Sequence, residues 1–558
     1  MDWLGRVRGA AAPNVYDIAS RTDPWLVTHD RFADPETWNQ LFLGVDAAAS
    51  ILTTAPRTHA LVLGPPQSLK SAGELVPMIL FANGPTVATS TKEDIYRATA
   101  MARSRKGDLW HFAPDGSPPL PGTIPLHWSP IGPSKDWATA LMLGKLMAEA
   151  ADVAGGTNES AFFRQKAGEM VASLLHGAGL AGKPMEWVLE AVAENDRNLR
   201  DAESIMRSTG GYSNIGADAL AGIMRLDGRS RGSIIATTSN AFSAYRLPGA
   251  LEVTRNPNFD EHAFVAGQPD VVNPGLFGRL QWAGGNPGSA FGRYDTLYIT
   301  ASAQAQAFVA PLVVALLSRI RQARYDIHRH DQMYSYERPP AFFALDEVAN
   351  IAPLPELPSI LAEGSSQGVL TCCVMQDLSQ AKVRWKDHHE GFPTLFREVV
   401  AFPGIRNPET LEQLSQLSGD VWEEQFGSSA NWNKHSKRRG DWSAGESVSE
   451  QRRARYSPPE IYRGASEDED PAALDPRRML VMDSTGKTDW AFSAPYFFSP
   501  PLAEALVGVV ENIVTHATRG AWSLMLPPPD LRPEMMATPG IDRRWNAALQ
   551  RLHELVRE

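Results

Sequence analysis

The residues best suited to chemistry lie in the segment LVLGPPQSLKSAG, residues 61–73. A predicted strand ends at a glycine, a proline-rich turn follows, and a Lys-Ser pair opens a helix. This order matches the phosphate-binding loop Gly-x-x-x-x-Gly-Lys-Ser/Thr at every position but one. In such a loop, backbone N–H groups at a helix N-terminus receive phosphates, the lysine reaches the terminal phosphates, and the hydroxyl binds magnesium. The predicted nucleotide-binding residues are Gly64, Pro65, Gln67, Ser68, Lys70 and Ser71, with Ser71 also a metal ligand.

The one mismatch is Leu69, which stands where the motif has its second glycine. A loop glycine supplies backbone angles that cost other residues about 1–3 kcal/mol, or it leaves room for the phosphates. Weaker nucleotide binding, a distorted loop path and loss of hydrolysis are all open outcomes. On this segment alone, a turn that binds nothing is also open.

Two further segments end in polar residues. The apolar run in RPPAFFALDEVANI, residues 338–351, ends in Asp346 and Glu347, which is the form of a Walker B strand. The first carboxylate of such a strand binds the metal, and the second can polarise the attacking water. The run VLTCCVMQ, residues 369–376, ends in Gln376, which could sense the terminal phosphate from the crevice of an open α/β sheet. Each pattern is common alone, but their order along the chain makes them support one another.

Other reactive residues form no competing pattern. The sequence has no His-Glu-x-x-His helix and no Gly-x-Ser-x-Gly elbow. Its two cysteines, Cys372 and Cys373, are adjacent in an apolar run, so we expect two buried strand residues in a reducing cytosol. The basic run Lys434, Lys437, Arg438 and Arg439 is expected to be a solvated loop, with contact to DNA or anionic lipid as the alternative.

Alternating β-rich and helical stretches must position these residues. Apolar runs at 59–64, 85–91, 108–113, 295–301, 341–347, 369–376 and 397–402 are typical of strands covered on both faces. We therefore predict an α/β fold with a mostly parallel, doubly wound sheet. A helical pattern is also predicted within residues 36–52, ahead of the first of these runs, and a late hairpin and a closing helix near the end of the chain.

One interval breaks this alternation. From about residue 137 to 265 the apolar periodicity is helical, and more than 100 helical residues cannot be an ordinary connection between strands. The predicted organisation is an N-terminal soluble segment (1–57), a nucleotide-binding domain in two parts (58–136 and 266–420), an inserted all-α domain (137–265), a mobile charged excursion (421–470), and C-terminal strands and helices that complete the nucleotide-binding domain (471–558).

Composition limits the function. The 558 residues include 53 Lys and Arg against 64 Asp and Glu, a net charge of −11, which excludes a protein that coats DNA nonspecifically. A ring-shaped motor with basic residues only along its channel remains compatible. The longest apolar run, AFVAPLVVALL at 307–317, is short of the roughly 18–20 residues of a membrane span. The start of the chain lacks the apolar core of a signal peptide. We therefore expect a soluble, cytoplasmic chain.

In combination, five segments resemble the TraG/TraD-type coupling proteins of type IV secretion and conjugation, in particular those of actinobacteria. Between about residues 58 and 420 they are, in order, VLGPPQSLKSAGELVP, VATSTKEDIYRATAMARSRKGDLWHFAPDG, WSPIGPSKDWATALMLGKLM, LYITASAQAQAFVAPLVVALLSRI and FFALDEVANIAPLPELPSILAEGSSQGVLTCCVMQDLSQAKVRW. The resemblance implies a RecA-like P-loop domain with an inserted all-α domain. It also implies a homo-hexamer that uses ATP and Mg²⁺ to move single-stranded DNA, or a relaxase–DNA complex, towards a membrane channel.

Carried over by position, the resemblance gives Gly64, Lys70 and Ser71 to the phosphates and magnesium, Asp346 to the metal, Glu347 to the catalytic water and Gln376 to the γ-phosphate. The all-α domain would receive substrate or an accessory protein. The implied location is the cytoplasm, peripheral at the inner face of the cell membrane, together with other secretion-system subunits.

The sequence departs from the family in three ways. Leu69 replaces the loop glycine; Ser365 and Ser366 stand where some members place an arginine that reaches the neighbouring subunit; and the membrane helices of most members are not found before the loop. Arg384, Arg397 or Arg406 could replace that arginine. A membrane-anchored partner could replace the helices, or the anchor is missing from this sequence. A non-hydrolysing recognition or scaffold subunit, and another RecA-like DNA motor, are the alternative functions.

Overall fold

The computed structural model describes residues 38–46, 51–104, 106–151, 158–193, 196–267, 294–334, 338–385, 391–432, 442–466, 469, 477–483 and 485–493. The predicted closing helix and the basic run at 434–439 lie outside the described residues.

A twelve-stranded sheet forms the centre of the molecule, in the order β2-β1-β14-β13-β10-β3-β9-β8-β4-β7-β5-β6. Neighbouring strands from β10 to β6 are parallel, whereas β13, β14, β1 and β2 are joined by antiparallel pairs. The strands are β1 (Phe42–Val45), β2 (Ile51–Thr53), β3 (Ala60–Leu63), β4 (Thr86–Ser90), β5 (Leu109–Phe112), β6 (Ile124–Pro125), β7 (Thr296–Thr300), β8 (Ala341–Leu345), β9 (Val369–Met375), β10 (Glu398–Ala401), β13 (Arg478–Asp483) and β14 (Thr488–Phe492). The predicted mostly parallel sheet is confirmed.

The central strands are buried on both faces, which explains their continuous apolar runs. In β3, Leu61 and Leu63 pack into one core cluster, and Ala60 and Val62 into the other. This alternation follows from the pleat, which directs successive side chains to opposite faces. Helices cover both sides: the second cluster includes residues of α3 (Val76–Phe81) and α4 (Asp94–Ser104), and the first includes residues of α14 (Gln306–Tyr334).

The two cysteines follow the same alternation. Cys372 and Cys373 are free and fully buried in β9, and each belongs to a different core cluster. Burial raises the pKa of both thiols, so the ionised form that reacts is disfavoured. The prediction of two buried strand residues is confirmed.

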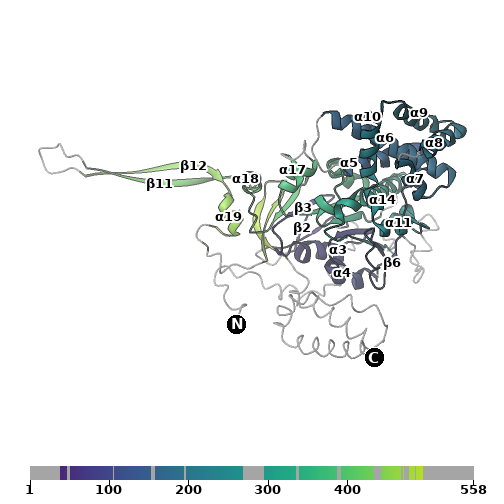
Figure 1. The fold of residues 1–558 in the computed structure, drawn as a ribbon. Coiled ribbons are helices and arrows are strands. Elements are labelled where there is room, and N and C mark those ends of the chain that lie inside the picture. The colour runs from purple at the N-terminus through teal and green to yellow at the C-terminus, as the bar shows by residue number, and fades with distance from the viewer. Residues whose placement is uncertain are drawn as a thin grey trace, which may run out of the picture.

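Eight α-helices lie in the described residues between β6 and β7, and they form the inserted all-α domain at one end of the sheet (Figure 1). They are α5 (Trp137–Ala150), α6 (Asn158–Ala181), α7 (Met185–Val192), α8 (Asp196–Thr209), α9 (Ser213–Met224), α10 (Gly228–Ala241), α11 (Pro248–Thr254) and α12 (Glu261–Ala266). Helix α6 is central, since α5, α8, α9 and α10 all pack on it. Gly144 and Gly168 let α5 and α6 approach closely, because a Cβ on Gly144 would lie 2.4 Å from the Gly168 oxygen.

Five shorter helices lie in the described residues between β8 and β13. They are α15 (Val348–Ile351), α16 (Leu357–Glu363), α17 (Ser379–Trp385), α18 (Pro408–Leu417) and α19 (Pro458–Arg463). Among the described residues, no helix is apolar over enough length to cross a bilayer. The apolar run at 307–317 lies in α14 and packs into the core.

The helix predicted within residues 36–52 is wrong, because the described part of this segment forms strands β1 and β2. Val45 pairs with Phe492 of β14, from the far end of the chain. Gly44 has a φ of 95°, and a Cβ there would lie 2.3 Å from the Phe492 oxygen. Long-range strand pairing therefore overrides the local helical pattern, as tertiary context commonly does.

The segment predicted as a surface excursion contains a ladder of two strands, β11 (Asp420–Trp432) and β12 (Trp442–Ala454). They pair in register from Asp420 opposite Ala454 to Trp432 opposite Trp442. Figure 1 shows this ribbon projecting from the end of the molecule opposite the all-α domain. The sequence predicted the excursion but not its paired strands.

A buried ionic cluster connects the end of α14, the start of β8 and the end of α12. Asp331, only 3% exposed, accepts from Arg338 Nε at 2.9 Å and lies 3.5 Å from Arg324 Nη1. Arg324 Nε donates to the Gly368 oxygen, and Arg338 Nη1 to the Ala266 oxygen. Removing one partner of a buried pair costs about 3–5 kcal/mol because the other charge is left uncompensated.

This cluster predicts an unequal response to two glycine substitutions. Gly368 has a φ of 78°, and a Cβ there would lie 2.8 Å from Arg324 Nη2; Gly182 has a φ of 61° with no heavy atom within 4 Å of such a Cβ. We expect Gly182→Ala to lower the free energy of unfolding by about 1 kcal/mol, from backbone strain alone. Gly368→Ala should lower it by about 3 kcal/mol or more, since it also displaces Arg324. Urea unfolding measures both, and equal losses would contradict the clash.

Candidate nucleotide-binding site

The loop after β3 has the backbone of an anion-binding nest. Gln67 and Leu69 have positive φ values of 65° and 66°, and Lys70, which follows, is right-handed with φ −47° and ψ −54°. Alternation of left- and right-handed residues directs successive N–H groups into one concavity, which attracts anions. Because Pro65 and Pro66 lack N–H groups, the donors of this loop begin at Gln67.

Leu69 therefore adopts the left-handed angle that the glycine of the motif would supply. Its side chain packs against the second core cluster, and its oxygen accepts from the Gly73 N–H at 2.6 Å. A left-handed residue other than glycine costs about 1–2 kcal/mol, and the apolar contact offsets part of that cost. The chain keeps the angle at this position without a glycine.

Gly64 and Lys70 close the loop. A Cβ on Gly64 would lie 2.7 Å from Ser68 Oγ and 2.8 Å from Phe402 Cβ, so only glycine fits there. Lys70 Nζ donates to the oxygens of Gly64 at 2.5 Å and Pro65 at 2.6 Å. Burial lowers the pKa of Lys70, while Asp346 and Glu347 act in the opposite direction. The ammonium is thus held inside the loop and faces two carboxylates.

Sheet order brings the separate motifs together. Strand β9 lies between β3 and β8, so the carboxyl ends of all three meet at one edge of the sheet. Ser71 Oγ, in the helical turn after the loop (Ser71–Leu75), donates to Asp346 Oδ2 at 3.0 Å across 275 residues of sequence. Thr89 Oγ1, in β4, donates to the Asp346 backbone oxygen at 2.9 Å. The hydroxyl and the carboxylate predicted to share a metal are therefore in direct contact.

Asp346 is buried among other acidic groups. Burial raises the pKa of Asp346 to about 7, and the nearby charges of Glu347 and Asp94 act in the same direction. The hydrogen bond from Ser71 and the charge of Lys70 act in the opposite direction. Near neutral pH this carboxyl is therefore poised between its acid and its ionised form, and a cation beside it would favour the ionised form.

Glu347 has an unusual backbone for a non-glycine residue, with φ 50° and ψ 41° at the start of α15. Its N–H donates to Asp346 Oδ1 at 3.2 Å, and its carboxylate Oε2 accepts from Asn350 Nδ2 at 3.1 Å. Such strained residues persist where the surroundings hold them and are frequent at functional sites.

Gln376 directly follows β9 and is half-buried, at the same edge of the sheet. Its N–H donates to Gln380 Oε1 at 2.9 Å. Of the residues in contact with the site, sequence reasoning missed Thr89 and Asn350. Both had a usable pattern: Thr89 lies near the carboxyl end of a predicted strand, and Asn350 lies three residues after Glu347.

The residues at this edge suit a nucleotide with Mg²⁺. Ser68 Oγ is buried and has no hydrogen-bond partner among the described residues, which fits a hydroxyl that faces a ligand. Ser71 and Asp346 offer the oxygen ligands that Mg²⁺ prefers, and Mg²⁺ sites of this kind use one or two protein oxygens together with phosphates. The nest and Lys70 supply donors for phosphate.

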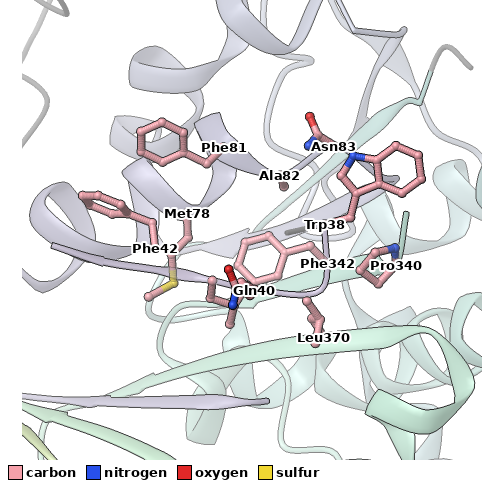
Figure 2. Close-up of a pocket in the computed structure, with 11 residues that line it drawn as sticks. Trp38, Gln40, Phe42, Met78, Phe81, Ala82, Asn83, Pro340, Phe342 and Leu370 are labelled. Carbon is pink, nitrogen blue, oxygen red and sulfur yellow. The ribbon is translucent and has the colours of Figure 1, made fainter. Parts of the chain in front are cut away.

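A small hollow lies at the opposite edge of the sheet. Figure 2 shows it between the segment from Trp38 to Phe42, the end of α3 and the starts of β8 and β9, where Pro340 and Leu370 lie. Its volume is about 20 Å³, which holds about one water molecule. It is too small for a nucleotide, and it lies at the edge of the sheet opposite to the phosphate-binding loop.

The serines that replace an arginine lie in a helical turn at Gly364–Gln367, ahead of β9. Of the three possible substitutes, Arg397 and Arg406 are exposed and Arg384 is half-buried in α17. Burial lowers the pKa of Arg384. Arg397 directly precedes β10, and Arg406 lies in the loop that follows it.

Two family models match the chain. Residues 26–271 match the model described as type IV secretory system conjugative DNA transfer, and residues 340–463 match the model described as the TraM recognition site of TraD and TraG. No curated protein sequence matches it.

Solved structures give the same answer for the fold. The unbound monoclinic form of the bacterial conjugative coupling protein TrwBdeltaN70 has a TM-score of 0.53 and 16% identity, covering 82% of this chain and 88% of that one. The plasmid coupling protein TrwB with the non-hydrolysable GTP analogue GDPNP has a TM-score of 0.51 and 16% identity, with 78% and 86% covered. TrwB with ADP and Mg²⁺ has 0.50 and 15%, with 79% and 85% covered. The predicted RecA-like fold with an inserted all-α domain is confirmed.

The left-handed angle at Leu69 makes a prediction about two smaller residues at that position. Leu69→Gly and Leu69→Ala both lose the packing of the leucine side chain, but only the alanine variant keeps the strain of a left-handed backbone angle. We expect the glycine variant to be about 1 kcal/mol more stable than the alanine variant in urea unfolding. The reverse order would show that the loop does not take this angle in solution.

The raised pKa of Asp346 makes a prediction about stability and pH. A carboxyl with a folded-state pKa near 7 and an unfolded-state pKa near 4 favours the folded state fully below about pH 4, and this contribution is lost as pH rises to about 7. In the parent protein the free energy of unfolding should therefore fall by at most about 1.4 kcal/mol per pH unit over that range. We expect this fall to be absent from Asp346→Asn, whose side chain can still accept from Ser71. Urea unfolding from pH 4 to 8 without Mg²⁺ measures it.

Asp201→Asn is the matched control, because Asp201 is exposed on α8. Its pH dependence should follow that of the parent protein. If Asp346→Asn also follows the parent, the carboxyl is not buried as described.

Proposed function

Because the chain is a TraG/TraD-like coupling protein of type IV secretion, we propose that it binds and hydrolyses ATP to move DNA, or a DNA–protein substrate, towards a membrane channel. One observation carries the proposal: Ser71 of the phosphate-binding loop donates to Asp346 of the acidic strand, at the edge where the anion-binding nest opens. Two motifs distant in sequence thus form one site with the parts that phosphoryl transfer requires.

The roles of the residues follow from their positions. The nest at Gln67–Lys70 and the Lys70 ammonium bind the phosphates. Ser71 and Asp346 hold the metal, which when bound neutralises charge on the phosphate oxygens. Glu347 accepts a proton from the attacking water, and Gln376, one strand away, contacts the terminal phosphate.

Binding of nucleotide by TrwB supports the choice of cofactor, since its structures contain ADP with Mg²⁺, GDPNP and ADPNP. We further propose a homo-hexamer in which Arg384, Arg397 or Arg406 of one subunit serves the site of the next. The substrate would be single-stranded DNA or a relaxase–DNA complex. Its partners would be other secretion-system subunits, including a membrane-anchored one that holds the chain at the inner face of the cell membrane.

A non-hydrolysing recognition or scaffold subunit is the second candidate. The serines at 365 and 366 favour it, since an arginine supplied to a neighbouring site contributes about 10³–10⁵ in rate. Leu69 gives the scaffold function weaker support than the serines do, because the backbone adopts the left-handed angle of the motif with leucine at this position. Steady-state ATP turnover separates the two functions.

We expect the full chain to hydrolyse ATP and single-stranded DNA to accelerate turnover. Lys70→Ala should abolish both ATP binding and turnover, because the phosphates lose their lysine. Glu347→Gln should keep ATP binding while kcat falls about 100-fold or more, since the glutamine cannot take a proton. A fluorescent ATP analogue measures binding, and phosphate release measures turnover.

The control is Lys183→Ala, an exposed lysine just after α6 in the all-α domain. It should behave as the parent protein. ATP binding by Lys70→Ala at the parent's affinity would reject the site, whereas ATP binding by the parent without any turnover would favour the scaffold.

A further inference from the structure

We propose that Asn350 is a positioning residue for Glu347: its side-chain amide holds the Glu347 carboxylate in one orientation and leaves Oε1 as the oxygen that meets the attacking water. This inference rests on the proposed hydrolysis and adds to it a residue that the motifs do not contain. It follows from the contacts on both sides of the Asp346–Glu347 peptide.

Asn350 contacts Glu347 twice. Its N–H donates to the Glu347 backbone oxygen at 2.8 Å, and its side-chain Nδ2 donates to Glu347 Oε2 at 3.1 Å. The N–H of Ile351 donates to the same backbone oxygen at 3.2 Å. The first turn of α15 is thus built on Glu347, and the amide of Asn350 has a fixed place relative to the carboxylate.

This turn is rigid because its other residues are buried. Val348, Ala349 and Ile351 are each at most 2% exposed and belong to the first core cluster. A hydrogen bond from such a turn costs little side-chain freedom, and a fixed donor restricts the carboxylate to a narrow range of orientations.

The neighbouring strand holds the other end of the same peptide. Thr89, fully buried in β4, donates to the Asp346 oxygen, and the Glu347 N–H donates to Asp346 Oδ1. The left-handed backbone of Glu347 is therefore fixed before and after its Cα. Its side chain is what remains free to turn, and Asn350 is the residue that restrains it.

The charged groups nearest to Glu347 belong to the site itself. Lys70 interacts with both carboxylates of the acidic pair, and Asp94 interacts with Asp346. Strands β4 and β9, which also pack on α15, contain no charged residue. The remaining two neighbours are α14 and α17, and most of their charged groups are in ion pairs. The pairs are Arg319 with Glu261, Arg321 with Glu356, Arg324 with Asp331, and Lys382 with Glu409. Arg384 of α17 is half-buried, and burial lowers its pKa.

The first test uses Asn350→Leu and Asn350→Asp in the full chain. Loss of the amide in Asn350→Leu should lower kcat about 10-fold with KM for ATP within twofold of the parent. Asn350→Asp keeps the size of the side chain but cannot donate to the carboxylate, so kcat should fall by a similar factor, again with KM within twofold of the parent. A purely structural role would leave kcat of Asn350→Asp at the parent's value, and that result would overturn the inference.

The second test needs no turnover. Asn350→Leu should lower the midpoint of thermal unfolding in the parent but by less than half as much in Glu347→Ala, where the carboxylate partner is absent. Equal shifts in both backgrounds would overturn the inference even if the chain hydrolyses no ATP. Asn214→Leu, at an exposed position of α9, is the matched control and should leave both readouts unchanged. Failure of the parent to turn over ATP would reject the proposed function alone.

Discussion

The hydrogen bond between Ser71 and Asp346 is the contact on which the arrangement of the site depends. It exists because β3 and β8 are parallel and one strand apart, so that the loop leaving β3 and the acid ending β8 emerge on the same side. Parallel strands need crossover connections, and the all-α domain also lies between β3 and β8 in the chain, so two residues in contact are 275 positions apart. The sheet order, rather than either motif, makes the site.

At the carboxyl ends of these strands, acidic groups outnumber the nearby cations, as in a metal site without its metal. Asp346 and Glu347 adjoin each other, Asp94 is near, and Lys70 is the facing cation. Burial is the larger cause of the raised pKa of Asp346, because desolvation disfavours the ionised form of this carboxyl, and the repulsion adds to it. A divalent cation would relieve the repulsion, so stability at the site and affinity for such a cation are coupled.

The sequence predicted much of this architecture and missed parts with identifiable reasons. The buried strands were predictable because both faces are covered and each strand reads as a continuous apolar run. Strands β1 and β2 were not, since β1 joins the sheet through β14, more than 440 residues away, and β2 joins it through β1. The left-handed Leu69 was anticipated only as a cost. Thr89 and Asn350 were missed because a single hydroxyl or amide acquires meaning only from the atom it contacts.

The insertion point of the all-α domain has a consequence for how such proteins can diversify. The chain enters the helices after β6, and the far end of the helical segment returns beside it, because the Trp128 N–H donates to the Val253 oxygen at 2.7 Å and the Asn258 N–H donates to the His127 oxygen at 3.0 Å. A module whose ends nearly meet can be lengthened, shortened or exchanged without changing the register of any strand. The candidate nucleotide site is at the carboxyl ends of β3, β9 and β8, which are in the middle of the strand order. The all-α domain and the candidate nucleotide-binding edge are therefore free to evolve at different rates.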